Sequence, residues 1–411
     1  MKVLLISQYF FPEQFKCNDV AFELSRRGYD VTVLTGIPNY PQGKYFRGYG
    51  LFRKRVEMID GVRIIRSFQF PRGSGSGTRL VLNYFSWAFS ASFRAVFLCL
   101  HNSYDVVLVH ETSPVTVGIP AVFLRKLFKI PFHFWVLDLW PESLTAAGGI
   151  RNDLVLSFFR RLTCWIYDHS ARILMSSRSF RDSICEKGPY DDKLVYFPNW
   201  SDSSLSQSVP YVLPSLPTGF IVMFAGNIGE AQDLEHLLLA AESLRDSRDI
   251  HFVFVGDGRK RAWLEEYVKI HQLSETVHWV GRHPLSSMPS FFRSADVLLV
   301  SLKDEPVFNL TAPAKLQAYM QSGKPILGML NGEGHSLIVD SGCGFAVSAG
   351  DSAGLSSQIK HLSLTDACEL RSMGERGRHY CSLHFNLSKC MDHLCSLLEE
   401  TKTDTAYARN K

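Results

Sequence analysis

The feature that most constrains this chain is a strand, loop, helix and strand unit that occurs at its start and again after residue 219. The first copy has apolar runs at residues 2–6 and 31–34, and the helix between them ends in two arginines and Gly28. The second copy has runs at 220–224 and 251–255. Short runs of this kind are typical of parallel strands buried on both faces, and a glycine after basic residues marks the end of a helix. The pattern predicts a parallel α/β sheet in each half.

The length agrees with two domains, because 411 residues exceed the ~100–200 residues at which one domain usually closes. We therefore predict an α/β chain of two doubly wound, Rossmann-like domains that face a central cleft, where ligands of such sheets bind. The boundary is expected near residues 200–218, in a segment rich in serine and proline that ends at Pro217. This places domain 1 at 1–199 and domain 2 from residue 200.

Charge and cysteine content exclude several functional classes. The net charge is only +4, which argues against a general nucleic-acid binder. The nine cysteines include no Cys-x-x-Cys pair, which favours a reduced compartment and argues against a disulfide framework or a metal centre. Residues 1–15 are too polar for a signal peptide. The apolar stretch 80–100 contains Asn83 and Arg94, which favours an interfacial or core helix over a membrane span.

The second half contains two candidate anion sites. The loop Gly226-Asn227-Ile228-Gly229 lies between a strand and a helix, where free amides hold phosphate, and Gln232 follows at the helix opening. Further along, Thr311 is expected to be the N-cap of a helix that holds Lys315 at its positive end. Lys303 ends a strand nearby. The alternatives are a plain turn, a solvated first-turn glutamine, and lysines on a solvated surface.

The first half offers carboxylates at strand ends. Asp138 and Glu142 follow a buried strand, with Trp140 between them, and a carboxylate in this place can accept a proton from a hydroxyl. The alternative is that these two carboxylates cap a helix or pair with arginine. His110 ends the neighbouring strand, where a structural histidine is the more frequent outcome. A serine-hydrolase triad is not indicated, because the chain has no Gly-x-Ser-x-Gly motif.

Basic clusters also gather in the first half, at residues 53–55, 125–129 and 160–161. Together with the apolar stretch 80–100 they favour contact with an anionic membrane surface. The alternative is a solvated basic face.

The chain has six motifs in order, at residues 7–13, 35–43, 138–143, 198–200, 226–229 and 315–325. They resemble those of family 4 GT-B glycosyltransferases, in the branch of L-fucosamine transferase-like and colanic-acid-type enzymes of bacterial surface polysaccharide assembly. The resemblance implies transfer of a sugar, such as N-acetyl-L-fucosamine or another N-acetylated deoxyhexosamine, from a UDP-sugar donor. The acceptor would be a polyprenyl-diphosphate-linked saccharide in O-antigen or capsule assembly, at the inner face of the cell membrane.

The resemblance also implies how the parts are used. Domain 2, at 200–379, would hold the nucleotide, and a helix at about 380–400 would cross back to domain 1. No metal or other cofactor is expected. Nucleotide-sugar contacts are expected at Gly226, Asn227, Gly229, Gln232, Gly256, Lys303, Thr311 and Lys315. The expected acceptor contacts are Glu13, Asn18, Asn39, His110 and Trp140, and the expected catalytic residues are Asp138, Glu142 and Lys315.

The chain departs from the wider family at four positions. Asn227 and Gln232 stand where many members have Arg and Lys, and Leu310 and Ala318 stand where they have two glutamates. We interpret the Asn and Gln as features of the branch. The alternative functions are those of a UDP-GlcNAc 2-epimerase-like enzyme, which needs no acceptor, and of a non-catalytic protein that binds a glycan or a partner enzyme.

Overall fold

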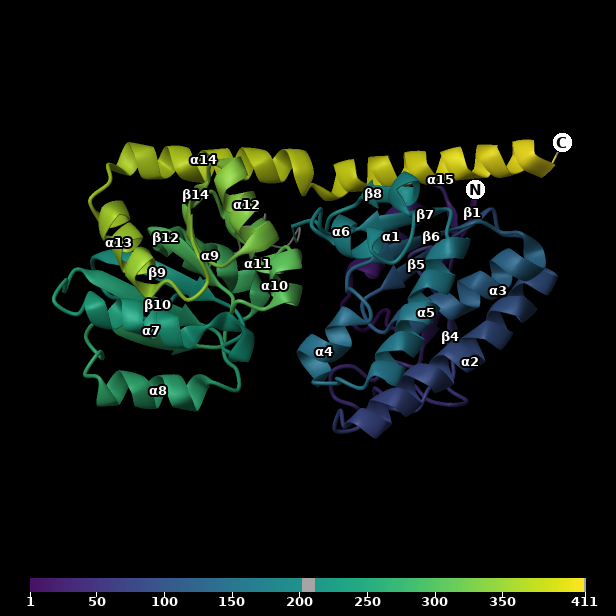
Figure 1. Ribbon diagram of the computed structural model, residues 1–411, viewed down its shortest axis with the longest axis horizontal. Coiled ribbons are helices and arrows are strands. Elements are labelled where there is room, and N and C mark those ends of the chain that lie inside the picture. Colours follow the sequence, from purple (N-terminus) through teal and green to yellow (C-terminus); the bar gives the residue numbers. More distant parts are fainter. Residues whose placement is uncertain (202–210, 410–411) are drawn as a thin grey trace. The chain divides into compact units, whose positions relative to one another are not determined.

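The protein consists of two compact units, described here from a computed structural model covering residues 1–201 and 211–409 (Figure 1). Unit 1 contains residues 1–198 and 390–411, and unit 2 contains residues 199–389. The division at 198 falls one residue before the expected boundary. The return to unit 1 comes at Cys390 and not at about 380, because Cys381 and Phe385 are buried in the core of unit 2. Part of the predicted linker, residues 202–210, lies outside the described residues.

Unit 1 is built on an eight-stranded sheet in the order β3-β4-β2-β1-β5-β6-β7-β8. Every neighbouring pair is parallel except β3 and β4. The strands are β1 Lys2–Ile6, β2 Asp30–Gly36, β3 Val56–Ile59, β4 Val62–Ser67, β5 Val106–Glu111, β6 Phe132–Val136, β7 Arg172–Met175 and β8 Leu194–Tyr196. Strands β5 and β6 are buried along their whole length, which agrees with their mainly apolar sequence.

The helices of unit 1 include the long α2, which contains the apolar stretch 80–100. They are α1 Lys16–Arg26, α2 Gly77–His101, α3 Ile119–Phe128, α4 Glu142–Gly148, α5 Asp153–His169, α6 Phe180–Cys185 and α15 Leu387–Arg409. In Figure 1, α2, α3 and α5 lie together, and α2 contacts α3, which contacts α5. Within the described ranges 1–201 and 211–409, no helix combines the length and apolarity that crossing a membrane requires.

Helix α15 is joined to unit 1 by side-chain contacts. Arg27 pairs with Asp392 at 2.5 Å, and the Tyr29 hydroxyl donates to Glu399 Oε1 at 2.6 Å. Further along the helix, Thr401 Oγ1 lies 2.8 Å from the Nε2 atom of the buried His133. The last helix is thus part of the unit that begins the chain.

Unit 2 has a six-stranded parallel sheet in the order β11-β10-β9-β12-β13-β14. The strands are β9 Phe220–Ala225, β10 Ile250–Val255, β11 Val277–Gly281, β12 Val297–Ser301, β13 Ile326–Met329 and β14 Gly344–Val347. The helices are α7 Leu234–Ser243, α8 Arg261–Ile270, α9 Met288–Ser294, α10 Pro306–Leu310, α11 Ala314–Ser322, α12 Gly332–Ser341, α13 Ser352–Ser363 and α14 Ala367–His384.

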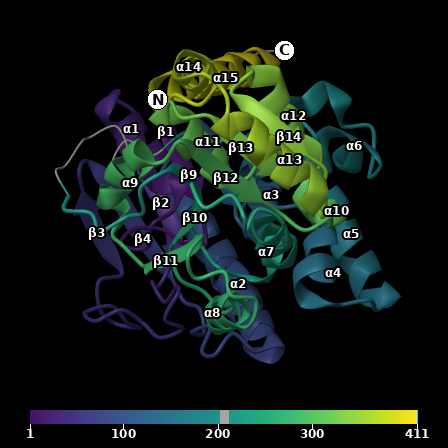
Figure 2. The same ribbon diagram turned by 90° about the vertical axis from the view of Figure 1, so that its left-hand side faces the viewer.

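Two apolar clusters cover the two faces of the unit 2 sheet. One joins the sheet to α7 and α13, and the other joins it to α9 and α11 (Figure 2). Because parallel strands end at the same edge, the loops after β9, β10 and β12 meet at one edge of unit 2. The loops after β1, β5 and β6 likewise meet at one edge of unit 1.

Candidate functional site

The backbone amides of the glycine loop of unit 2 donate hydrogen bonds to neighbouring residues, which the sequence analysis does not predict. The Gly226 amide donates to Val255 O at 2.8 Å, and the Ile228 amide donates to Asp257 O at 3.0 Å. The Gly229 amide donates to the Gln232 side-chain oxygen at 3.1 Å. The prediction that this loop presents free amides to a phosphate is therefore wrong for these three groups, and the Gln232 oxygen is occupied as well.

Gly256 has a packing role in the same region. It follows β10 with φ +143°, and a Cβ atom placed on it would lie only 1.9 Å from Gly226 O. Its own carbonyl accepts a hydrogen bond from Trp279 Nε1 at 2.9 Å. The glycine thus allows the loops after β9 and β10 to approach each other closely.

Lys315 points beneath this loop. It lies in the first turn of α11, and its ammonium is buried with no hydrogen-bond partner among the described residues. The Nζ atom lies 3.6 Å from the centroid of the Phe224 ring, and a Cβ atom on Gly226 would lie 2.6 Å from Lys315 Cε. Burial lowers the pKa of Lys315 to about 7. A desolvated cation of this kind is suited to bind an anion.

The lowered pKa predicts that the protein becomes more stable as the pH rises above neutral. The unfolded chain keeps the ordinary lysine pKa of about 10.4, so it binds more protons than the folded chain in this range. The penalty of the buried charge is present in full below about pH 7 and disappears as the pH rises towards 10.4. Urea unfolding of the wild type and of Lys315→Met between pH 6 and 9 tests this. A rise of the same size in both proteins would contradict the assignment.

The helix that carries Lys315 does not begin as predicted. Thr311 is not its N-cap: it ends α10, and its hydroxyl donates to Val307 O at 2.8 Å. Helix α11 begins three residues later, after Pro313. The reason is that the residue before a proline is disfavoured in helical conformation, so Ala312 cannot extend a helix from Thr311. Lys315 is nevertheless in the first turn, as expected.

The remaining predicted nucleotide contacts lie at the surface of the same edge. Lys303 Nζ is 3.5 Å from Glu230 Oε2, and Lys260 approaches the same carboxylate at 3.2 Å. Asn227 is exposed. Lys303 therefore has a carboxylate partner, which weakens its attraction for an added anion.

In unit 1, Asp138 follows β6 and is held by its neighbours. The Ser143 hydroxyl donates to the Asp138 carboxylate, and the Asp138 amide donates to Glu111 Oε2 at 3.2 Å. Burial raises the pKa of Asp138, and the hydrogen bonds from Ser143 and Ser113 oppose this shift. The pKa of Glu111, which is fully buried, is raised well above its usual range by burial and by the Asp138 charge. A carboxylate with a raised pKa at a strand end can act as a base.

Glu142 has a structural partner instead. Its Oε1 atom accepts a hydrogen bond from Lys187 Nζ at 2.5 Å and another from Ser183 Oγ at 3.1 Å. The Lys187 side chain is almost fully buried. This pair joins the start of α4 to the segment that follows α6, so the geometry favours the ion-pair alternative for Glu142, here with a lysine.

Glu13, Asn18 and Asn39, which are expected to contact the acceptor, lie close together in the structure. Their side chains bind to the backbone of two loops. The buried Glu13 Oε1 accepts from the amides of Asn39 and Tyr40 at 2.8 and 2.6 Å. Asn18 Nδ2 donates to Glu13 O at 2.7 Å. Burial raises the pKa of Glu13 to about 7. These residues fix the loops after β1 and β2, and they are positioning residues in this arrangement.

His110 and Trp140 are buried beneath the edge. His110 Nδ1 lies 3.1 Å from Ser7 Oγ, and its ring packs on Trp135 with the centroids 4.9 Å apart. Burial lowers the pKa of His110 to about 3, so the ring is neutral at physiological pH. The Trp140 ring packs on Phe159 with the centroids 5.0 Å apart. Neither ring is accessible in this structure.

Arg72, which the sequence did not single out, is the centre of an aromatic cluster. Its Nη1 atom donates to the Tyr9 hydroxyl at 2.8 Å, and its guanidinium lies 5.2 Å from the Tyr40 ring centroid and 5.9 Å from that of Tyr84. Among residues 1–201 and 211–409, no carboxylate pairs with it. Asp138 lies near enough to Tyr84 to contribute to the raised pKa of that tyrosine. The cluster offers a cation and tyrosine rings to an anionic or sugar ligand.

No group of three or more His, Cys, Asp or Glu residues with suitable geometry to hold a metal ion occurs in residues 1–201 and 211–409.

Comparisons with known proteins agree with this architecture. Residues 16–200 match the family model described as "Glycosyl transferase 4-like domain", and residues 219–364 match "Glycosyl transferases group 1". The chain is 27% identical to glycosyltransferase WbjE of Pseudomonas aeruginosa, covering 74% of this chain and 77% of WbjE. It is 25% identical to the colanic acid biosynthesis glycosyl transferase WcaI of Escherichia coli K12, covering 79% and 82%.

The fold is also shared with a solved structure. The crystal structure of Anabaena HepE in complex with UDP and glucose superposes with a TM-score of 0.67, at 12% identity, over 97% of this chain and 99% of HepE. This likeness concerns the fold alone.

Proposed function

The chain is a GT-B glycosyltransferase with a 4-like domain followed by a group 1 domain, and from this premise we propose that it moves a sugar from a UDP-sugar to a lipid-linked saccharide. The name of WcaI, a colanic acid biosynthesis glycosyl transferase, supports a place in surface polysaccharide assembly, such as that of O-antigen or capsule. The proposed donor sugar is N-acetyl-L-fucosamine or another N-acetylated deoxyhexosamine. The proposed acceptor carries a polyprenyl diphosphate.

The observation that carries the proposal is the unpaired ammonium of Lys315. It lies beneath the loop after β9, at the sheet edge where a nucleotide binds in such folds. Its charge would bind the donor diphosphate and offset the negative charge that develops as UDP leaves. The UDP complex of HepE supports a UDP-linked donor by analogy. Because a side-chain cation has this role, we expect turnover to persist in EDTA.

On the acceptor side we propose that Asp138 contacts the reacting hydroxyl and accepts its proton. Its burial and raised pKa support this role. Arg72 and the surrounding tyrosines are proposed to contact the acceptor at the same edge of unit 1. Glu13, Asn18 and Asn39 would act indirectly, because they hold the loops that form this edge.

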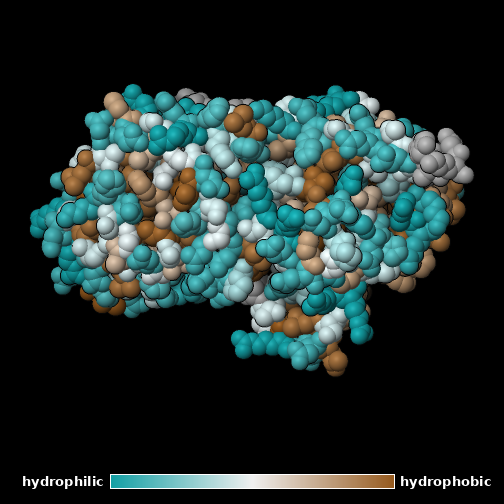
Figure 3. Space-filling model, turned by 45° about the horizontal axis from the view of Figure 1, so that its top comes forward, coloured by the Kyte–Doolittle hydropathy of each residue, from teal (hydrophilic) through white to brown (hydrophobic). Residues whose placement is uncertain are grey.

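We also propose that unit 1 binds to the inner face of the cell membrane without crossing it. The face in Figure 3 is mainly hydrophilic, with hydrophobic residues scattered over it. Helix α2, in contrast, exposes Phe89 by 70%, Phe93 by 65% and Leu100 by 66%. Basic residues lie on the helices beside it: Lys126 of α3 lies over the Trp165 ring of α5, and Arg161 of α5 is exposed. Such a combination supports peripheral binding to anionic lipid.

Activity with defined substrates tests the proposed function. A panel of UDP-sugars, including UDP-N-acetyl-L-fucosamine and UDP-GlcNAc, is incubated with polyprenyl-diphosphate-GlcNAc, and products are detected by mass spectrometry. We expect an acceptor enlarged by one sugar residue. Epimerised UDP-sugar formed without acceptor would support the epimerase alternative, and no transfer to any acceptor across the panel would contradict the proposal.

Membrane binding has its own prediction. We expect co-sedimentation with anionic vesicles that weakens as salt is added. Reversing two charges, in Lys126→Glu with Arg161→Glu, should lower the partition coefficient about tenfold or more, because each basic residue near the surface contributes about 1 kcal/mol. The control, Lys360→Glu with Arg371→Glu, makes the same change in net charge on exposed sites of unit 2. Equal losses in both variants would contradict a binding face on unit 1.

A further inference from the structure

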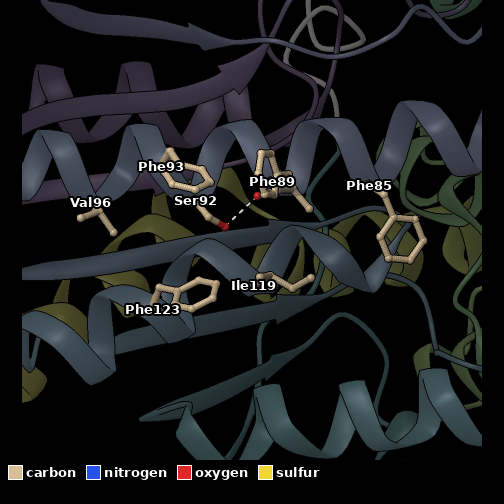
Figure 4. Close-up of a pocket in the computed structure, with 8 residues that line it drawn as sticks. Phe85, Phe89, Ser92, Phe93, Val96, Ile119 and Phe123 are labelled. Carbon is tan, nitrogen blue, oxygen red and sulfur yellow. Dashed lines mark hydrogen bonds between the residues drawn. The ribbon is translucent and has the colours of Figure 1, made fainter.

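A groove of about 430 Å³ runs between α2 and α3 of unit 1 (Figure 4). It is lined by Phe85, Ala88, Phe89, Ser92, Phe93 and Val96 of α2 and by Ile119 and Phe123 of α3. Figure 4 shows Phe85, Phe89 and Phe93 in succession along one helix, with Ile119 and Phe123 on the facing helix. This volume is within the range of ~300–1,000 Å³ that is typical of ligand pockets.

The sequence explains why a groove forms here. Phe85, Phe89 and Phe93 follow each other at intervals of four residues and therefore share one side of α2. Beside them, Ala88 is too small to fill the space towards α3, so the rings form a wall along an open channel. The only hydroxyl in the lining is that of Ser92, and it donates to Ala88 O at 2.7 Å. The lining therefore offers apolar surface and no charge.

One end of the groove adjoins the acceptor edge of unit 1. Phe85 is preceded by Tyr84, whose ring lies 5.9 Å from the Arg72 guanidinium. Asn83 accepts a hydrogen bond from Gln8 Nε2 at 2.9 Å, which fixes this part of α2 beside the loop after β1. From there the groove leads away along α2 to Phe93 and Val96. Arg72, a cation without a carboxylate partner, thus lies beside the residue that precedes the groove-lining Phe85 on α2.

We propose that this groove binds the isoprenoid chain of the acceptor, with Arg72 facing the phosphates to which the chain is attached. The inference rests on the proposed function for the presence of a polyprenyl diphosphate. Charge and shape together select this occupant: the cation matches a phosphate, and the aromatic walls match a branched hydrocarbon chain attached to it. A bilayer meets a protein as a broad surface, whereas the space between two helices admits one chain.

Binding measured without a bilayer tests the groove apart from catalysis. The probe is a photoreactive isoprenyl diphosphate in vesicle-free buffer, with its cross-links located by mass spectrometry. We expect cross-links on α2 and α3 and about tenfold weaker binding by Phe89→Asp, because a carboxylate replaces a ring that would be buried by the chain. The matched control is Leu100→Asp, on the same helix, similarly exposed and outside the lining. Circular dichroism spectra and thermal unfolding transitions like those of the wild type show that both variants remain folded.

The outcomes separate the two proposals. If Phe89→Asp weakens isoprenoid binding and Leu100→Asp does not, the result supports the groove as the isoprenoid site. This holds even if no sugar transfer is found, and in that case only the proposed function fails. If the rate of sugar transfer depends on the length of the isoprenoid chain to the same extent in the wild type and in Phe89→Asp, the groove does not bind the chain. The proposed function would remain intact. Absence of isoprenoid binding without vesicles, with equal losses of vesicle binding in Phe89→Asp and Leu100→Asp, would also overturn the groove as the isoprenoid site. The groove residues would then act only in the membrane contact that is proposed above for α2.

Discussion

Replacing Lys315 with methionine is expected to lower kcat/KM for the UDP-sugar by about 100- to 1,000-fold, as removal of one preorganised oxyanion donor does. The ammonium is buried and unpaired before the donor binds, so its interaction energy is available to the diphosphate. Methionine fills much of the same space against Phe224 and Gly226 without the charge. Steady-state kinetics with detection of released UDP measures the loss.

The same substitution is expected to stabilise the ligand-free protein or to leave its stability unchanged. A desolvated charge without a partner destabilises the folded state, and an apolar side chain of similar size removes that penalty. Thermal unfolding at pH 6 should therefore show an equal or higher Tm in Lys315→Met. Lost activity with a markedly lower Tm would point instead to a structural role of the lysine.

Lys303→Met is the matched control, because the sequence analysis proposed both lysines for the same site. Lys303 is partly exposed and has Glu230 as a neighbour, so its removal is expected to change kcat/KM by less than about fivefold, within the roughly 1 kcal/mol that exposed ion pairs contribute. Equal losses in the two variants would contradict the distinction between them.

The contrast between these lysines shows what the sequence could predict. The order of strands and helices follows from apolar runs and glycines, and the runs at 2–6 and 220–224 lie in β1 and β9. The prediction that Lys315 lies in the first turn of a helix is confirmed, and the prediction that Thr311 is the N-cap of this helix is wrong. Local patterns suffice for such conclusions, because strand and helix positions depend mainly on nearby residues.

Contacts between distant loops were not predictable in this way. The amides of Gly226 and Ile228 donate to carbonyls at the end of β10 and just after it, and the Gln232 side chain accepts from the Gly229 amide. The sequence analysis does not identify Arg72, because the three tyrosines around it are distant in sequence, at positions 9, 40 and 84. A signal was present, since Arg72 lies in the loop that follows β4, a parallel strand of the same sheet.

Asp138→Asn is expected to lower kcat by about 100- to 10,000-fold, the usual contribution of a general base, with a much smaller change in KM. The amide keeps the shape of the side chain and can still accept the hydrogen bond from Ser143, but it cannot take a proton. Glu142→Gln is the control. It weakens the pair with Lys187 and should cost about 1–3 kcal/mol of stability, while the kcat of the folded protein stays near that of the wild type.

The pH dependence distinguishes a base from a residue that only supports the fold. The carboxylate form of Asp138 is required, so kcat should fall as the pH drops through its pKa, which burial raises above the usual range. The hydrogen bond from Ser143 lowers this pKa, and Ser143→Ala should therefore move the acidic limb of the kcat profile to higher pH. Asp138→Asn should abolish that limb. If the limb stays in place in both variants, another group titrates in the reaction and Asp138 is not the base.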